Sequence, residues 1–140
     1  MQQVLPKGHK KLLNAWAFYD WANSVYSLVI ASAIFPIYYS AISKNAFEAG
    51  NVPDMFKGMN NESIIIITTA IAFLIVSIIS PILSGVADYS GKKKRLLQFF
   101  CYLGGICSIG LAFFSFDHLW ISLLIYLLAL VGFWGSLVFY

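Results

Sequence analysis

Charged residues are scarce in this chain of 140 residues, and their scarcity excludes an ordinary water-soluble fold. Asp, Glu, Lys and Arg make up 11% of the sequence, whereas a soluble globular domain contains about 25%. Hydrophobic residues make up 60%, including 12 Phe, 8 Tyr and 4 Trp. A soluble domain of this size cannot bury so much apolar surface. The composition therefore predicts an integral membrane protein in contact with the lipid bilayer.

Residues that bind metals or act as nucleophiles are also sparse. Cys101 and Cys107 share one apolar run, where helical geometry points their side chains about 120° apart, and we interpret them as packing residues. His9 lies in a basic segment and His118 in a short turn, and neither has partners at ligand spacing. No nucleotide-binding loop is present. The sequence therefore predicts no catalytic residue, metal site, cofactor, enzymatic activity or nucleic-acid partner.

Four apolar runs are long enough to cross a bilayer, for which a helix needs about 20 residues. They predict an all-α membrane protein with four transmembrane helices. The predicted segments are a basic cytoplasmic tail over 1–11, membrane helices over 12–42, 63–88, 96–116 and 119–140, an extracytoplasmic loop over 43–62, a basic cytoplasmic loop over 89–95 and a short turn at 117–118.

Proline and small residues refine these segments. Pro36 predicts a kink or the end of the first helix, because proline lacks the backbone N–H that a helix needs. The small residues over 77–85, and the stripe of Gly104, Ser108 and Ala112, predict close helix packing. In the fourth run, Gly132 and Ser136 are also four residues apart. Within the 43–62 loop, Met55 and Phe56 suit a short interfacial helix.

Positive charges are concentrated at two places. Three lysines precede the first apolar run, and Lys92–Arg95 lie between the second and third runs. Two predicted spans separate these places, so both fall on one side of the membrane. Loops rich in Lys and Arg stay in the cytoplasm. We therefore predict a cytoplasmic N-terminus, with the mildly acidic 43–62 loop on the opposite side.

Polar side chains form a stripe on one face of the first predicted helix. Trp16, Asp20, Asn23 and Ser27 recur at spacings of four, three and four. An ionised carboxylate facing hydrocarbon costs at least ~2.5–3.5 kcal/mol, so we expect this face to meet protein or water. Asp20 could bind a substrate amine or carry a proton, or it could fix helix packing through a hydrogen bond. The candidate substrate or proton pathway comprises Asp20, Asn23, Tyr26 and Ser27.

A tight basic turn joins the second and third runs over Ser84–Leu96. Gly91 permits a sharp reversal of the backbone, and the third helix begins near Lys93. Asp88 then lies close to a row of cations and to the positive end of that helix. The structural alternative is that these cations only anchor the topology.

The order of residues in this turn resembles the loop between helices two and three of major facilitator superfamily transporters. Asp88 matches the acid of that pattern and Gly91 its turn glycine, whereas Tyr89 replaces a usual cation. Ser84 also departs from the pattern, which usually has glycine there. The resemblance implies a cytoplasmic gating latch made of Ser84, Gly85, Asp88, Gly91, Lys92 and Lys93.

A second stretch narrows the resemblance. Residues 18–26, Phe-Tyr-Asp-Trp-Ala-Asn-Ser-Val-Tyr, with Phe-Pro-Ile-Tyr-Tyr at 35–39, are similar to the first helix of the unknown major facilitator family. That group is related to the fungal autophagy-associated vacuolar amino-acid effluxers. The resemblance implies a twelve-helix major facilitator fold built from three-helix repeats, of which this chain holds the first four helices. The fourth run has no Arg, which many proton-coupled members carry there.

The resemblance also implies a secondary-active transporter of a small polar solute, with amino acids as candidates, working by alternating access in the bacterial inner membrane. The sequence ends at Tyr140 inside an apolar run, so we expect an N-terminal part whose partners include the remaining helices of a longer chain. Two alternatives stay open. One is a four-helix exporter of the small multidrug type that works as a dimer with Asp20 as its acid, and the other is a non-transporting membrane helix-bundle subunit.

Overall fold

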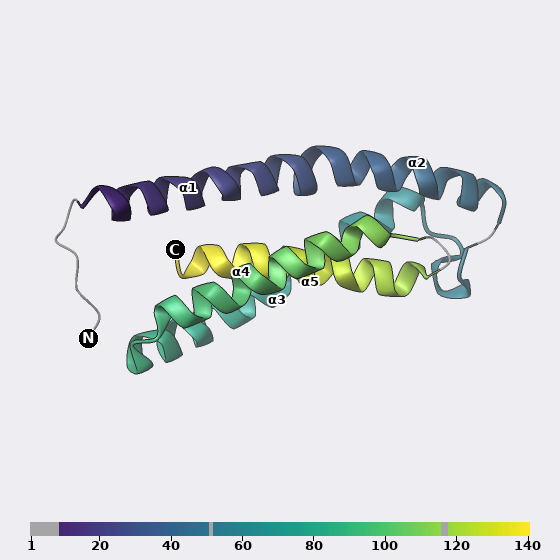
Figure 1. The fold of residues 1–140 in the computed structure, drawn as a ribbon. Helices are drawn as coiled ribbons and strands as arrows, with labels where there is room; N and C mark the ends of the chain where they lie inside the picture. Colours follow the sequence, from purple (N-terminus) through teal and green to yellow (C-terminus); the bar gives the residue numbers. More distant parts are fainter. Residues whose placement is uncertain (1–8, 51, 116–117) are drawn as a thin grey trace. The chain divides into compact units, whose positions relative to one another are not determined.

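The computed structural model describes residues 9–50, 52–115 and 118–140, and these ranges contain helices and no strand. The chain divides into two units, Met1–Pro36 and Ile37–Tyr140. Residues 1–8 and the predicted turn residue at 117 lie outside the described ranges. The elements, shown in Figure 1, are α1 (Lys10–Tyr26), the π-helix η1 (Ser27–Ile34), α2 (Phe35–Glu48), the 3₁₀ helix η2 (Asp54–Phe56), α3 (Asn61–Ser90), α4 (Lys93–Gly110), the 3₁₀ helix η3 (Leu111–Phe113) and α5 (Leu119–Val138).

Four helical stretches of the described chain are long and apolar enough to cross a membrane. They are Lys10–Glu48, Asn61–Ser90, Lys93–Phe113 and Leu119–Val138, and the second has the highest mean hydropathy, at 2.6. The predicted all-α class with four membrane-spanning helices is therefore confirmed.

The first helical stretch continues through Pro36, where we predicted a kink or an end, and past residue 42, where we predicted the end of the span. Proline has no backbone N–H to donate to a carbonyl one turn earlier. The π-helical segment directly before Pro36 has wider hydrogen-bond spacing, which accommodates this missing bond within a continuing helix. It also extends to Glu48, six residues into the predicted 43–62 loop. The buried Ser43 hydroxyl donates to the Tyr39 carbonyl oxygen, so a polar side chain is accommodated without leaving the helix. Gly50, with φ of 73°, follows the end of α2.

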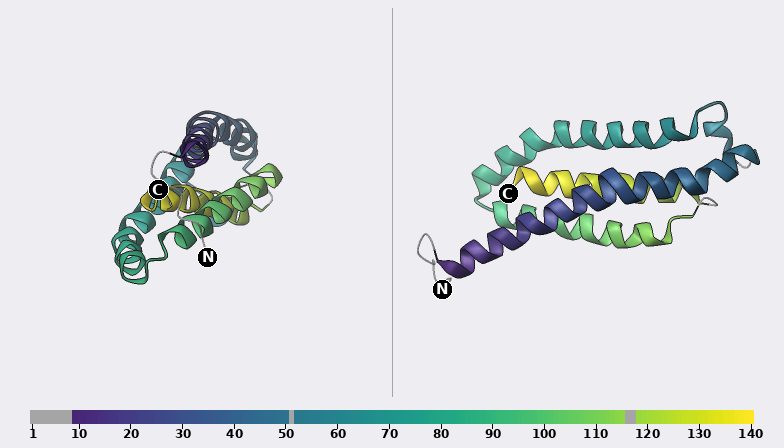
Figure 2. Two further views of the ribbon diagram at one scale, coloured as in Figure 1. Left: turned by 60° about the vertical axis from the view of Figure 1, so that its left-hand side comes forward. Right: turned by 90° about the horizontal axis from the view of Figure 1, so that it is seen from above.

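Within the Ile37–Tyr140 unit, α5 lies between α3 and α4, as Figure 2 shows from above. Eleven residues of α5 are buried, against four of α3 and two of α4, so α5 forms the core of this unit. A hydrogen bond between hydroxyl groups joins α3 to α5, with 3.2 Å between Thr69 Oγ1 and Tyr126 Oη.

The crossing of α4 and α5 depends on glycine. A methyl group added at Gly132 would lie 2.6 Å from the Gly104 Cα and 3.0 Å from the Phe100 carbonyl oxygen. A methyl group at Gly135 would lie 2.6 Å from the Phe100 ring. The predicted close packing is confirmed at Gly104, whose partner in α5 is Gly132. Close packing at the small residues of α3 is not seen at Gly85, where an added methyl group would meet no atom within 4 Å.

Aromatic side chains also pack together around α2, η2 and the start of α5. Tyr39 Oη donates to the Asn61 carbonyl oxygen at 3.2 Å, and the Tyr39 ring packs edge-on against Phe114. The expected short helix at Phe56 is present as η2, and the Phe56 ring lies 5.0 Å from that of Trp120.

Replacing Gly132 with alanine should destabilise the protein, because the new methyl group overlaps the backbone of α4. Overpacking of this kind costs about 1–3 kcal/mol. Gly105→Ala is the matched control, because the space beside Gly105 is open. Thermal unfolding of the detergent-solubilised protein should show a lower midpoint for Gly132→Ala alone. Equal midpoints for the two variants would contradict the backbone crossing.

Candidate functional site

The polar stripe of the first helix lies within the Met1–Pro36 unit, on α1 and the start of η1. Asp20 and Asn23 belong to α1, and Ser27 is the first residue of η1. No residue of α1 is buried, and Asp20 is exposed. A carboxylate on a helix that enters a bilayer needs protein or water beside it, so this face is suited to contact something other than lipid.

Hydroxyl groups beside Asp20 bond to their own helix. Ser24 Oγ donates to the Asp20 carbonyl oxygen at 3.0 Å, and Ser27 Oγ donates to the Ser24 carbonyl oxygen at 3.1 Å. The Asn23 amide nitrogen has no hydrogen-bond partner among the described residues. The serine side chains are thus occupied locally, whereas the Asn23 amide can still donate to another group.

The π-helical segment η1 follows this stripe directly and was missed by the sequence reasoning. Ser32 Oγ donates to the Ser27 carbonyl oxygen, five residues earlier, at 2.9 Å, which matches the wider spacing of a π-helix. Pro36 was the available signal, since a missing N–H in a continuing helix requires a local change of register. π-Helical turns recur at functional sites because they displace side chains from the regular helical faces.

The second candidate site is the turn between α3 and α4 in the Ile37–Tyr140 unit. Asp88 Oδ1 lies 2.5 Å from Lys93 Nζ, and each side chain is 60% exposed. Gly91 adopts the left-handed conformation, with φ of 63° and ψ of 16°, and ends α3. The expected sharp reversal at Gly91 and the start of the next helix at Lys93 are therefore observed. The ion pair links the last turn of α3 to the first residue of α4.

One face at the end of α3 is small and uncovered. Asp88 lies four positions after Ser84 and three after Gly85, so it shares a face of the helix with both. Ala87 is fully buried on another side of the helix, which orients α3 within the unit. Gly85 is exposed and has open space beside it. A second helix could therefore approach the α3 backbone closely beside the Asp88 carboxylate.

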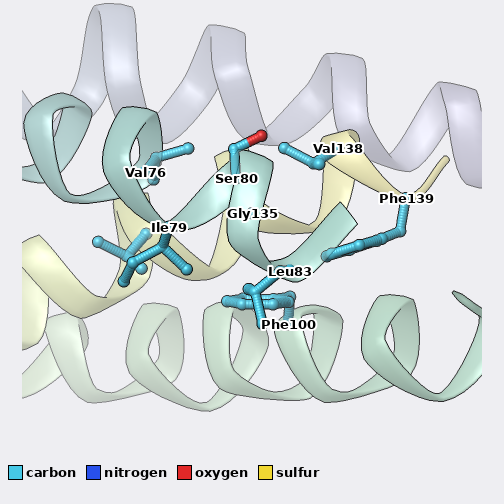
Figure 3. A pocket seen from close by; sticks show the side chains of 9 residues that line it. Val76, Ile79, Ser80, Leu83, Phe100, Gly135, Val138 and Phe139 are labelled. Carbon is cyan, nitrogen blue, oxygen red and sulfur yellow. The ribbon is translucent and has the colours of Figure 1, made fainter. Parts of the chain in front are cut away.

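Two cavities within the same unit are apolar. A cavity of about 10 Å³ lies where α3, α4 and α5 meet and is lined by Val76, Ser80 and Phe100 among others (Figure 3). A larger one, of about 240 Å³, is lined mainly by isoleucine, leucine and aromatic side chains. The hydroxyl of Thr68, which also lines it, donates to the Ile64 carbonyl oxygen. Neither cavity provides a charged group for a polar solute.

Metal chemistry finds no support in the described residues, where no group of three or more His, Cys, Asp or Glu side chains could hold an ion. The candidate residues instead form two separate sets, one around Asp20 on α1 and one around Asp88 at the α3–α4 turn. The first is a polar face and the second an ion-paired turn.

Comparison with known proteins identifies the family of this chain. The family model described as "Vacuole effluxer Atg22 like" matches residues 8–140. The chain belongs to this Atg22-like family. The Atg22-like chain is also 37% identical, over 134 residues, to the uncharacterized MFS-type transporter YxiO of Bacillus subtilis (strain 168). The predicted resemblance to major facilitator transporters and vacuolar effluxers is confirmed.

The matched region covers 96% of this chain but only 29% of the length of the curated relative. No solved structure matches it significantly. The family is one of transporters, not a class of enzymes. The four apolar helices and the bacterial relative together identify an integral membrane protein.

Proposed function

We propose that this chain forms the first part of a secondary-active transporter that moves a small polar solute, such as an amino acid, by alternating access. The match of residues 8–140 to an effluxer family carries this proposal. The relative is described as an MFS-type transporter, and this chain spans 29% of it. That length leaves room for a twelve-helix fold in which the four described helices are joined by others.

The proposed orientation places the N-terminus and the α3–α4 turn in the cytoplasm of a bacterial plasma membrane. Lys10 and Lys11 begin α1, and Lys92–Arg95 surround the start of α4. Two membrane-spanning stretches lie between these basic ends, so they share one side. Cytoplasmic retention of Lys and Arg supports the inward assignment.

The turn around Asp88 is proposed to act as a latch between transport states. Asp88 Oδ1 is paired with Lys93, which leaves Oδ2 able to accept a further hydrogen bond. The open space beside Gly85 would let another helix of the full-length protein present a donor to that oxygen. A contact made in only one state biases the equilibrium toward that state. Lys92 would add positive charge beside the contact.

Asp20 is proposed to lie on the path of the solute or of a coupling proton, with Asn23, Tyr26 and Ser27 deeper in the helix. Asp20 is exposed on α1, and the Asn23 amide has a donor to spare. A carboxylate next to an amide suits the ammonium and polar groups of an amino acid. The π-helical segment beginning at Ser27 would let this region change register as the transporter opens and closes.

Replacing Asp20 with asparagine should reduce proton-coupled transport while preserving insertion. The test uses the full-length protein in liposomes and measures flux of labelled amino acids with and without an imposed pH gradient. Ser24→Ala is a control, because the Ser24 hydroxyl bonds only to its own helix in the described structure. Wild-type flux and unchanged pH dependence in Asp20→Asn would remove Asp20 from the mechanism. Absence of flux for every amino acid in the wild type would contradict an amino-acid substrate.

Replacing Asp88 with asparagine should lower the transport rate with little loss of stability. An exposed ion pair contributes only about 0–1 kcal/mol, so a large loss of flux would come from the missing latch. Glu48→Gln is the matched control, since it removes one exposed acid at the end of α2. Unchanged flux in Asp88→Asn would exclude the latch. A large drop in its unfolding midpoint would instead assign Asp88 a structural role.

A further inference from the structure

We propose that the α3–α4 turn binds the headgroups of anionic phospholipids through Lys92, Lys94 and Arg95. This inference depends on membrane insertion of α3 and α4 and is independent of the proposed solute. It also holds for either orientation of the chain, because it requires only that the turn meet a leaflet containing anionic lipid.

The helices place these three cations at the boundary of the bilayer. Both Asn61–Ser90 and Lys93–Phe113 are apolar enough to cross the membrane, and the turn between them comprises only two residues. Lys92, Lys94 and Arg95 are exposed. Leu96 and Leu97 follow at once and begin the apolar part of α4. The charged groups therefore lie where the apolar helices leave the hydrocarbon.

The charges of the turn are unbalanced within the described chain. Asp88 pairs with Lys93, and no described carboxylate forms an ion pair with the other three cations. The first turn of α4 contains no acidic residue, and Lys92 provides no side-chain cap. Cations at the positive end of a helix repel its dipole. An anion bound among them would relieve both this repulsion and the mutual repulsion of the side chains.

A lipid headgroup fits this site better than a dissolved anion. Tyr89 stands beside the turn with 97% of its surface exposed, and tyrosine favours the membrane interface, where its ring meets the acyl boundary and its hydroxyl meets water. A headgroup is already held at that depth and at high local concentration. Each Lys or Arg near an anionic surface raises binding about fivefold.

The test compares lipid retention by the full-length protein in mixed micelles of phosphatidylglycerol and phosphatidylcholine, using native mass spectrometry. The variant Lys94→Gln/Arg95→Gln removes two of the three cations and retains the Asp88–Lys93 pair. The variant Lys44→Gln/Lys57→Gln is the control, because it removes the same charge from α2 and from the segment that joins α2 to α3. Circular dichroism checks that both variants keep the helix content of the wild type.

The wild type and the control should retain phosphatidylglycerol in preference to phosphatidylcholine, and high salt should weaken that preference. In Lys94→Gln/Arg95→Gln, binding of phosphatidylglycerol should fall about fivefold per neutralised cation. Equal losses in both variants would show a general charge effect and overturn the site. Absence of a preference in the wild type, or its removal by excess inorganic phosphate, would also overturn the lipid assignment. If Lys94→Gln/Arg95→Gln loses helix content, the wild-type salt and phosphate results decide the outcome.

Discussion

Hydrocarbon offers no hydrogen-bond partner, and the polar groups of the membrane helices are arranged around that constraint. Several described serine and threonine hydroxyl groups meet it by bonding within their own helix. Thr68 donates to the Ile64 carbonyl, Ser108 to the Gly104 carbonyl and Ser136 to the Phe133 carbonyl. Such bonds let a polar residue remain in a helix without any tertiary partner. A carboxylate cannot be satisfied in this way, since it has no proton to donate when ionised.

In the proposed function, Asp20 is the residue that orients the first helix. Its face must meet water or another helix, and the neighbouring serines do not compete for it because they bond to backbone carbonyls. Asp88 differs from Asp20 in this respect, because it lies at the exposed end of α3 and is paired with Lys93. The proposed roles therefore differ, with Asp20 on a path within the membrane and Asp88 at the membrane surface.

The glycine crossing of α4 and α5 gives the Asp88 turn a firm support. Gly132 and Gly104 bring the two backbones together, and Phe100 packs over Gly135. Membrane helices gain stability from such close contact because lipid provides no hydrophobic driving force between them. The start of α4, with Lys93, is thereby tied to α5, while α3 carries Asp88. A latch built on this support can respond to another helix without disturbing the unit.

Composition and periodicity predicted the four spans, the reversal at Gly91 and close packing at Gly104, whereas the pairing of Gly104 with Gly132 comes from the structure. The predicted features depend on the conformational preferences of individual residues, on their spacing, or on the length of an apolar run, and all three can be read from the sequence. The π-helical segment before Pro36 was not predicted, because its register depends on cooperative hydrogen bonding over eight residues. The Thr69–Tyr126 bond joins residues 57 positions apart, and no local pattern marks that pairing.

The candidate sites were predicted as named residues on a helix face or in a turn, without their tertiary contacts. The tight turn at Gly91 brings Asp88 and Lys93 together, so their pairing follows from sequence proximity and backbone geometry. The open space beside Gly85 depends instead on the tertiary positions of the other helices. The partners of Asp20 likewise depend on tertiary arrangement, because a stripe defines a face of the helix but not its neighbour.

The proposed orientation places the basic α3–α4 turn in the cytoplasm and the 43–62 segment on the other side of the membrane. The most direct test labels single cysteines in intact cells with a membrane-impermeant maleimide, after native cysteines including Cys101 and Cys107 are changed to serine. Lys57→Cys should react in intact cells, whereas Lys94→Cys should react only after permeabilisation. Reaction of Lys94→Cys in intact cells, with Lys57→Cys protected, would reverse the orientation and contradict the account.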